Sequence, residues 1–397
     1  MLKTFKCISL GAFLVQAHAL EIRIDYTYDT NNFFNTQEKR DAMEAVADFY
    51  GNMIQDNLLR IDQSEFSASW TASFFHPSTG ALQTIPGLVV PEDVIIVYVG
   101  GRGLGGSTAG VAGPGGFTSA SGGQLWFDRV LGRGQPGAES LTPSENTDYA
   151  PWGGSISFDN SSRTWNFSQT GNQPGTEFMK IALHEMGHVL GIGTADTWDN
   201  QLSGGTFTGP AVINSFGSAP GADGGHFQGS LNSELFGSFG VTHGSSRPVL
   251  MLPGSIDTGT NFDVATDLDL AALVDIGWEI RPKTELRSTA LSPSAASFNW
   301  NSVSFRTYQV QRSVNLSSFA SGGSLQGNGN GLVQAWSDPA PPADRAFYRL
   351  RVDEVNFPAP SIEISMDSGD AAQLESISKA PKLVEGCDYE CCNSDRP

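Results

Sequence analysis

The sequence predicts an α+β fold for residues 20–282. Residues 21–28 alternate between apolar and polar side chains, which is typical of a half-buried strand. Residues 37–58 carry apolar side chains at helical spacing, and residues 93–99 form a continuous apolar run rich in β-branched residues. A strand, an amphipathic helix and a buried strand in this order indicate a sheet covered by helices.

The next part of the chain predicts a long loop and three strands. Residues 100–123 are rich in glycine and predict the loop. The sequence Gly-Arg-Gly-Leu-Gly-Gly within it lacks the Gly-Lys-Ser/Thr ending of a phosphate-binding loop, which argues against that function. Residues 124–127, 154–158 and 164–168 favour strands, the last two joined by a turn around residues 160–162.

A buried helix is expected after these strands, because apolar residues recur at three- and four-residue spacing from Phe178 to Leu190. Pro174–Gly175 interrupts the chain before this helix. Gly191 and Gly193 end it, since glycine readily adopts the left-handed conformation found at helix C-termini. The chain can then turn and bring a further side chain towards the end of the helix.

This helix contains the sequence His-Glu-Met-Gly-His-Val-Leu-Gly at residues 184–191. Residues four positions apart lie on one face of a helix, so His184 and His188 can direct their ring nitrogens at one metal ion. Glu185 projects beside them, where its carboxylate can take a proton from a metal-bound water. The motif predicts a hydrolytic zinc site with two histidine ligands and Glu185 as general base.

The motif resembles that of the metzincin zinc peptidases as far as Gly191. Those enzymes usually have their third histidine at the position that Thr194 occupies here, and threonine is an improbable zinc ligand. Leishmanolysin-like metzincins place that histidine far downstream, after an insertion, and this chain resembles their bacterial secreted relatives. The resemblance implies that His226 is the third ligand.

Alternatives for the third ligand stay open. His243 is the second candidate, whereas His76 lies upstream of the helix in a predicted loop. Asp196 and Asp199 are further candidates, because carboxylates also bind zinc. A gluzincin, the class in which a carboxylate from a nearby second helix binds the metal, is less favoured, because residues 200–222 contain no acidic residue and Glu234 is a remote candidate.

The resemblance also implies a fold and a supporting methionine. Met251 would be the methionine-turn residue, and residues 267–278 resemble the helix and closing strand that follow this turn. The implied fold is a metzincin-like catalytic domain with a twisted mixed sheet, a zinc-binding helix and an irregular C-terminal subdomain. The first predicted strand directly follows the predicted leader, which leaves no room for a prosegment with a zinc-blocking cysteine.

Residues 1–19 predict a secretory signal peptide. Lys3 and Lys6 precede a short apolar core, and Ala17–His18–Ala19 has the small-x-small pattern of a cleavage site. No stretch approaches the roughly 20 apolar residues that a membrane span needs. We therefore expect a secreted protein without a membrane span.

The chain is strongly acidic, with a net charge of −19. This charge argues against nucleic acid and anionic membranes as partners. It is compatible with calcium binding, but Asp263, Asp267 and Asp269 do not form an EF-hand pattern, so calcium has no further support. The oligomeric state cannot be predicted.

Three further regions follow the predicted catalytic domain. Residues 283–296 predict a polar linker, and residues 297–352 a small all-β module of the sandwich type. Residues 353–397 predict an acidic, mostly disordered tail. This tail contains Cys387, Cys391 and Cys392, whose pairing is open: one disulfide with a free thiol, or a link to another chain.

The sequence as a whole predicts a secreted zinc metalloendopeptidase that acts on protein or peptide substrates. One alternative is a zinc hydrolase of non-peptide bonds, because the motif specifies the activated water and not the substrate. The other is a secreted surface-binding or adhesive protein with a vestigial zinc site. Thr194 and the appended β module favour that last interpretation.

Overall fold

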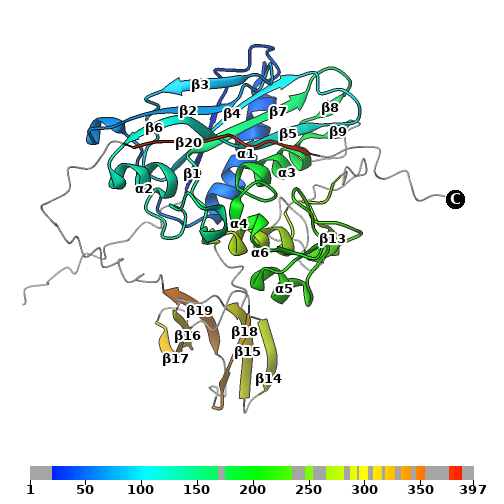
Figure 1. Cartoon of the computed structure of the whole chain (residues 1–397). Coiled ribbons are helices and arrows are strands. Elements are labelled where there is room, and N and C mark those ends of the chain that lie inside the picture. The colour runs from blue at the N-terminus through cyan, green and yellow to red at the C-terminus, as the bar shows by residue number, and fades with distance from the viewer. Residues whose placement is uncertain are drawn as a thin grey trace, which may run out of the picture.

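The computed structural model describes most of the chain between residues 20 and 386 (Figure 1). The described ranges are 20–168, 175–234, 246–253, 265–280, 287–292, 295–302, 307–314, 318–326, 332–340, 346–353 and 375–386. Within them the chain forms six helices and several sheets, which confirms the predicted α+β class. In these ranges no helix is long and apolar enough to cross a membrane. The predicted leader lies outside them.

A five-stranded sheet forms the centre of the N-terminal part of the described chain. Its strands, in spatial order, are β1 (Glu21–Asp25), β4 (Val94–Arg102), β7 (Gly153–Asp159), β5 (Gly110–Pro114) and β21 (Val384–Gly386). The first three strands are parallel, whereas β5 runs antiparallel to β7 and β21 antiparallel to β5. The sheet is therefore mixed, as expected.

Strand β4 has an apolar sequence because both of its faces are buried. Ile95, Val97 and Val99 lie in one hydrophobic core, and Ile96 and Tyr98 lie in a second core on the opposite face. Alternate residues of a strand point to opposite faces, so a strand covered on both sides must be apolar throughout. The prediction of a buried strand here is confirmed.

A second sheet is entirely antiparallel. In spatial order it contains β20 (Glu375–Lys379), β6 (Gly116–Gly122), β2 (Ser69–Phe75) and β3 (Leu82–Pro86). Only Gly115 separates β5 from β6, so one chain segment passes from the first sheet to the second. The prediction of a long loop over residues 100–123 is wrong. The glycines of β5 and β6 allow other segments to approach the strands closely, so the glycine-rich sequence does not indicate irregular structure here.

Two further predictions in this region are wrong. Residues 124–127 begin helix α2 (Gln124–Gly132), because Trp126, Phe127, Val130 and Leu131 bury one helical face. The strands expected at 154–158 and 164–168 do not pair with each other. Strand β7 pairs with β4 and β5, while the short β8 (Trp165–Asn166) pairs with β9 (Thr176–Glu177).

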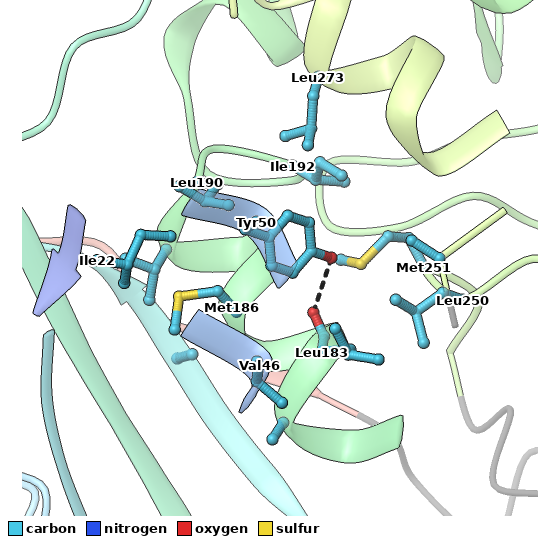
Figure 2. Close-up of a cluster of buried hydrophobic side chains, with 14 of the residues drawn as sticks. Ile22, Val46, Tyr50, Leu183, Met186, Leu190, Ile192, Leu250, Met251 and Leu273 are labelled. Carbon is cyan, nitrogen blue, oxygen red and sulfur yellow. Dashed lines mark hydrogen bonds between the residues drawn. The ribbon is translucent and has the colours of Figure 1, made fainter. Parts of the chain in front are cut away.

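Helices α1 (Gln37–Met53) and α3 (Phe178–Val189) pack together against the central sheet (Figure 2). α1 begins after Thr36, whose hydroxyl oxygen accepts a hydrogen bond from the Lys39 amide, as an N-cap residue does. The Tyr50 hydroxyl donates to the carbonyl of Leu183 at 3.0 Å, which ties the two helices together. Every residue of α3 is buried.

The chain after α3 forms a less regular subdomain. Its elements are α4 (Asp196–Asp199), β10 (Leu202–Ser203), β11 (Thr206–Phe207), α5 (Pro210–Phe216), β12 (Asn232–Glu234), β13 (Ser246–Pro248) and α6 (Asp267–Asp275). Two short 3-10 turns, Gln63–Glu65 and Pro143–Glu145, lie earlier in the chain. A helix is thus confirmed within residues 267–278.

The C-terminal module contains two three-stranded antiparallel sheets. One holds β14 (Arg287–Ser292), β15 (Ala295–Ser302) and β18 (Leu332–Asp338), and the other holds β17 (Ala320–Gln326), β16 (Thr307–Ser313) and β19 (Phe347–Asp353). The rings of Phe298 and Tyr348, one from each sheet, lie 4.6 Å apart. The described residues between 295 and 353 form strands and no helix, and β14 falls inside the predicted linker, because its pairing with β15 outweighs its polar sequence.

The tail also contains regular structure. Residues 375–379 and 384–386 form β20 and β21, so the prediction of a mostly disordered tail is wrong for this segment. Its strands pair with β6 and β5, which lie more than 250 positions earlier in the chain. Cys387, Cys391 and Cys392 lie outside the described residues.

Candidate metal centre

Three histidines meet at the end of α3. His184 and His188 lie one helical turn apart, and their Nε2 atoms are 3.1 Å from each other. The Nε2 atom of His226 lies 3.3 Å from that of His184. All three side chains are buried, and the potential ligand atoms of the trio all lie within 4.8 Å of one another. The structure therefore brings together the three predicted ligands.

The end of α3 allows the chain to return to the histidines. Gly191 and Gly193 both have positive φ angles, of 106° and 71°, as predicted for a helix C-terminus. The indole of Trp278 donates to the carbonyl of Leu190 at 2.7 Å and satisfies one of the carbonyls left open there. A side chain at Gly193 would overlap the carbonyl of Gly225, so glycine permits the close approach of the loop that carries His226.

The loop around His226 is held by hydrogen bonds and by packing. The Asp223 carboxylate accepts the backbone amides of Gly225 and His226, both at 2.8 Å. The amide of Phe227 donates to the carbonyl of Met251 at 3.1 Å, and the Phe227 ring packs edge-on against Trp198. These contacts fix His226 although the surrounding sequence is rich in glycine.

The hydrogen bonds of the two helical histidines select one tautomer. The Nδ1 atom of His184 lies 2.7 Å from the carbonyl of Leu250, and that of His188 lies 2.7 Å from the carbonyl of Ile192. A carbonyl can only accept, so each Nδ1 carries the proton and each Nε2 presents a lone pair. Metal-binding histidines typically have such a backbone partner.

The residues fit a tetrahedral metal ion. Ligand nitrogens at the usual zinc distance lie about 3.3 Å apart at tetrahedral angles, which matches the two separations here. Neighbouring lone pairs at this distance repel one another, and a cation between them removes that repulsion. Burial, followed by the adjacent rings, lowers the pKa of His188 well below its usual value. Burial and then His184 lower the pKa of His226 to about 3, so it too is neutral and ready to bind a metal at pH 7.

Glu185 lies against the central five-stranded sheet. It is fully buried on α3, beside His184, and its carboxylate packs against the backbone of Gly110 in β5. A side chain at Gly110 would overlap this carboxylate. Strand β5 of the central sheet therefore meets the carboxylate predicted to act as general base.

Met251 lies under the middle of α3 (Figure 2). A Cβ atom at Gly187 would lie 2.6 Å from the Met251 sulfur, so the methionine packs against α3 at this glycine, in the helical turn that carries His184 and His188. The carboxylate of Asp269 accepts the amides of Leu250 and Met251, both at 3.0 Å. These contacts hold the turn whose Leu250 carbonyl binds His184.

The structure separates the other candidates from the trio. The Thr194 hydroxyl donates to the backbone carbonyl of His188 at 2.6 Å. The Nδ1 atom of His76 accepts the Ser78 amide at 3.1 Å, away from the three histidines. Asp196 and Asp199 face lysines of the tail. His243 lies outside the described residues, and so does the side chain of Glu234.

The suggestion of calcium binding gains no support. Both oxygens of the buried Asp269 carboxylate accept protein hydrogen bonds, and Thr266 and Asp269 form the capping box of α6. In the described part of the chain, Asp267 and Asp269 join no group that could hold a metal. Asp263 lies outside that part.

Several residues that shape the site are not evident from the motif. The carbonyls of Ile192 and Leu250 carry no sequence signal, because every residue has one. Asp269 had a signal, since Thr266 and Asp269 match a capping-box pattern before an apolar run. Gly110 and Gly193 are two among 46 glycines, and only the fold shows which of them admit a close neighbour.

Comparison of the chain with models of known protein families, with characterised protein sequences and with solved structures finds no significant match. The resemblance to metzincins thus depends on the motif and on the arrangement of the site.

Proposed function

We propose that the chain is a secreted zinc-dependent endopeptidase with a metzincin-like catalytic domain. Three buried histidines could hold a metal ion, and a buried carboxylate from the same helix lies beside them. The observation that carries the proposal is the pair of Nε2 separations, 3.1 Å between His188 and His184 and 3.3 Å between His226 and His184, together with the backbone carbonyls that lie at the Nδ1 atoms of His184 and His188.

The residues supply the parts that hydrolysis requires. A zinc ion held by His184, His188 and His226 would act as a Lewis acid and lower the pKa of water towards about 7. Glu185 accepts the proton of the attacking water and later delivers it to the leaving amine. Its position in a dry interior, against β5, strengthens its electrostatic interactions with the reacting groups.

The first experiment replaces Glu185 without changing its shape. Glu185→Gln should bind one zinc per chain and lose at least about 100-fold in the cleavage of unfolded casein, because general-base catalysis typically contributes that much. Glu38→Gln, an exposed change at the start of α1, is the matched control and should keep full activity. Full activity in Glu185→Gln would contradict the mechanism.

The same assay separates the other functions that the motif allows. Zinc binding with cleavage of ester but not peptide substrates would indicate a hydrolase of another bond class. Zinc binding without hydrolysis of any substrate would favour a binding protein with a vestigial site.

A further inference from the structure

The segment 375–386 lies alongside β6 and β5 (Figure 1). Val384, Glu385 and Gly386 pair with Ala112, Val111 and Gly110 of β5. A few residues earlier, β20 pairs with β6 in the same antiparallel sense. The segment thus follows the continuous path of β5 and β6 and adds one strand to each sheet.

Two glycines in β5 and β6 leave space for the backbone of this segment. A side chain at Gly113 would overlap the carbonyl of Lys382, and one at Gly116 would overlap the carbonyl of Lys379. The three atoms nearest to each added Cβ all belong to the tail. Neither glycine has a positive φ angle, so the backbone itself does not require glycine there. The close approach of the tail is the reason that the structure gives for both.

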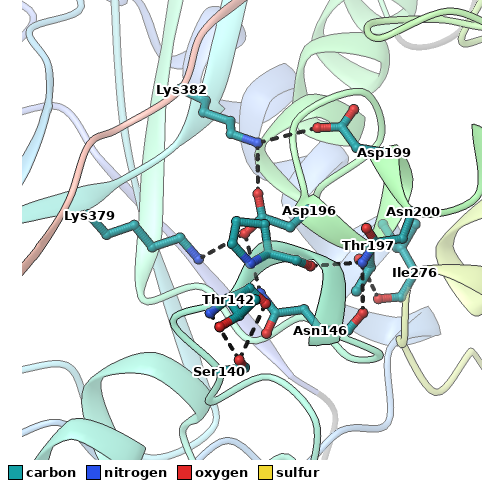
Figure 3. A network of polar contacts seen from close by, with 11 residues as sticks. Ser140, Thr142, Asn146, Asp196, Thr197, Asp199, Asn200, Ile276, Lys379 and Lys382 are labelled. Atoms are coloured by element: carbon teal, nitrogen blue, oxygen red, sulfur yellow. Dashed lines mark hydrogen bonds and ion pairs between the residues drawn. The ribbon is translucent and has the colours of Figure 1, made fainter.

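Charge complementarity holds the same segment (Figure 3). The ammonium group of Lys382 donates to Asp196 at 3.1 Å and lies 3.7 Å from Asp199, and that of Lys379 lies 3.9 Å from Asp196. Both acids belong to α4, which directly follows the glycine turn after α3. In a chain with 23 basic and 42 acidic residues, two lysines so close together on an acidic partner are a distinctive feature.

The end of the segment pairs with the residue that packs on the candidate general base. Gly386 is paired with Gly110, and Gly110 is the residue that packs on the Glu185 carboxylate. Without β21, strand β5 would be the edge of the central sheet on the side of α3. An extended peptide that reaches this site can bind by adding a strand to that edge. The edge has a single row of hydrogen-bonding groups, so it can pair with only one strand at a time.

We propose that residues 375–386 are an intramolecular ligand of this edge and exclude other extended peptides from the site. The part of the proposal that calls those peptides substrates rests on the peptidase function proposed above. Tethering gives the segment a high effective concentration at β5, so a free peptide competes poorly until the segment is displaced. The chain is thereby held in a state with restricted access to Glu185.

Two independent full-length variants displace the segment. Lys379→Glu with Lys382→Glu reverses its charges, and Lys379→Arg with Lys382→Arg is the matched control. Gly113→Ala with Gly116→Ala removes the space for its backbone, and Gly123→Ala is the control, because a side chain at Gly123 meets nothing within 4 Å. Circular dichroism and thermal melting establish that each variant is folded.

Hydrogen exchange and peptide binding provide the decisive readouts. Both displacing variants should exchange the slow amides of β5 at least about tenfold faster than wild type and controls, because exchange follows local opening. A fluorescent peptide with the sequence of residues 375–386 should bind the charge-reversed variant, whose glycines are intact, and not the wild type. Unchanged exchange in β5, or failure of the peptide to bind that variant, would overturn the proposal.

Cleavage of unfolded casein then tests the link to function. The charge-reversed variant should cleave at least about threefold faster than wild type, and added peptide should reverse this gain. Equal cleavage by both, with exchange in β5 already raised, would overturn the exclusion of substrates. If no zinc-loaded variant cleaves any peptide, the peptidase function fails, while exchange and peptide binding still decide whether the segment is a ligand of β5.

Discussion

At the scale of single residues, the candidate centre depends on backbone carbonyls as much as on histidines. The carbonyls of Leu250 and Ile192 hold the Nδ1 protons of His184 and His188, and so leave each Nε2 lone pair available to a metal ion. Asp269 in turn holds the turn that contains Leu250. A buried carboxylate from α6 therefore positions a ligand that belongs to α3.

Replacement of Asp269 should weaken both the fold and the metal site. Asp269→Ala leaves the buried amides of Leu250, Met251 and Thr266 without their acceptor, which should lower the free energy of unfolding by roughly 3 kcal/mol or more. Zinc affinity should fall about 10- to 100-fold, because His184 loses its fixed partner. Urea unfolding and zinc titration measure the two effects. Asp48→Ala, an exposed change on α1, is the control and should alter neither.

Asp148 makes stability depend on pH. Its burial, followed by the negative charges of Glu279 and Glu139, raises the pKa of this carboxyl to about 7, against roughly 4 in the unfolded chain. The folded state therefore binds more protons between these values, and stability falls as the pH rises through that window. The difference between the folded and unfolded pKa values corresponds to a change of roughly 4 kcal/mol in the free energy of unfolding. Solvent screening of a partly exposed carboxyl reduces this change to about 2 kcal/mol.

Asp148→Asn should remove this dependence. The amide oxygen can still accept the Tyr149 amide, which donates to Asp148 at 2.6 Å, but the side chain no longer becomes charged. The variant should match wild type at pH 4 and exceed it by about 2 kcal/mol at pH 8. Chemical unfolding at the two pH values tests this, and an equal advantage at both would contradict it.

At the scale of elements, the loops after α3 determine the site. Gly193 has a φ angle of 71° and lies against the carbonyl of Gly225, next to His226. Gly204 has a similar φ angle of 60°, but a side chain there would meet nothing within 4 Å. The two glycines thus share a backbone conformation and differ in their neighbours.

This pair separates backbone strain from the position of the metal ligand. The left-handed conformation is unfavourable for residues other than glycine. Through this effect, alanine at either position should lower the free energy of unfolding by roughly 1 kcal/mol. Only Gly193→Ala should also displace His226 and reduce zinc affinity, by about tenfold or more. Equal zinc affinities in the two variants would show that the approach of Gly193 to Gly225 does not matter for the metal.

The elements that could be predicted from the residues themselves are those with a clear apolar pattern. α1 and α3 bury faces that their helical spacing indicates, and β4 is a continuous apolar run. The helix within residues 267–278 followed only from the resemblance. The sequence predicts a short strand at the start of α2, because residues 124–127 are too few to show a helical period. β5 and β6 were not predicted, because a glycine-rich strand has no period and is specified by the neighbours that approach it.

At the scale of the whole molecule, contacts between distant segments complete the site. His184 and His188 were identifiable from four-residue spacing, whereas His226 followed only from the resemblance and is 38 positions further along. The pairing of residues 375–386 with β5 and β6 has no local signal at all, because the tail sequence is short and polar. Backbone pairing and two lysines place it, and both require the folded partner.

The central claim is that three histidines, one of them distant in sequence, hold one zinc ion. The most direct test is the zinc content per chain, by elemental analysis, of wild type and of His226→Ala, His243→Ala and His76→Ala. We expect one zinc in wild type, its loss in His226→Ala alone, and retention in the other two variants. Zinc retained in His226→Ala, or lost in His243→Ala, would contradict the site described above.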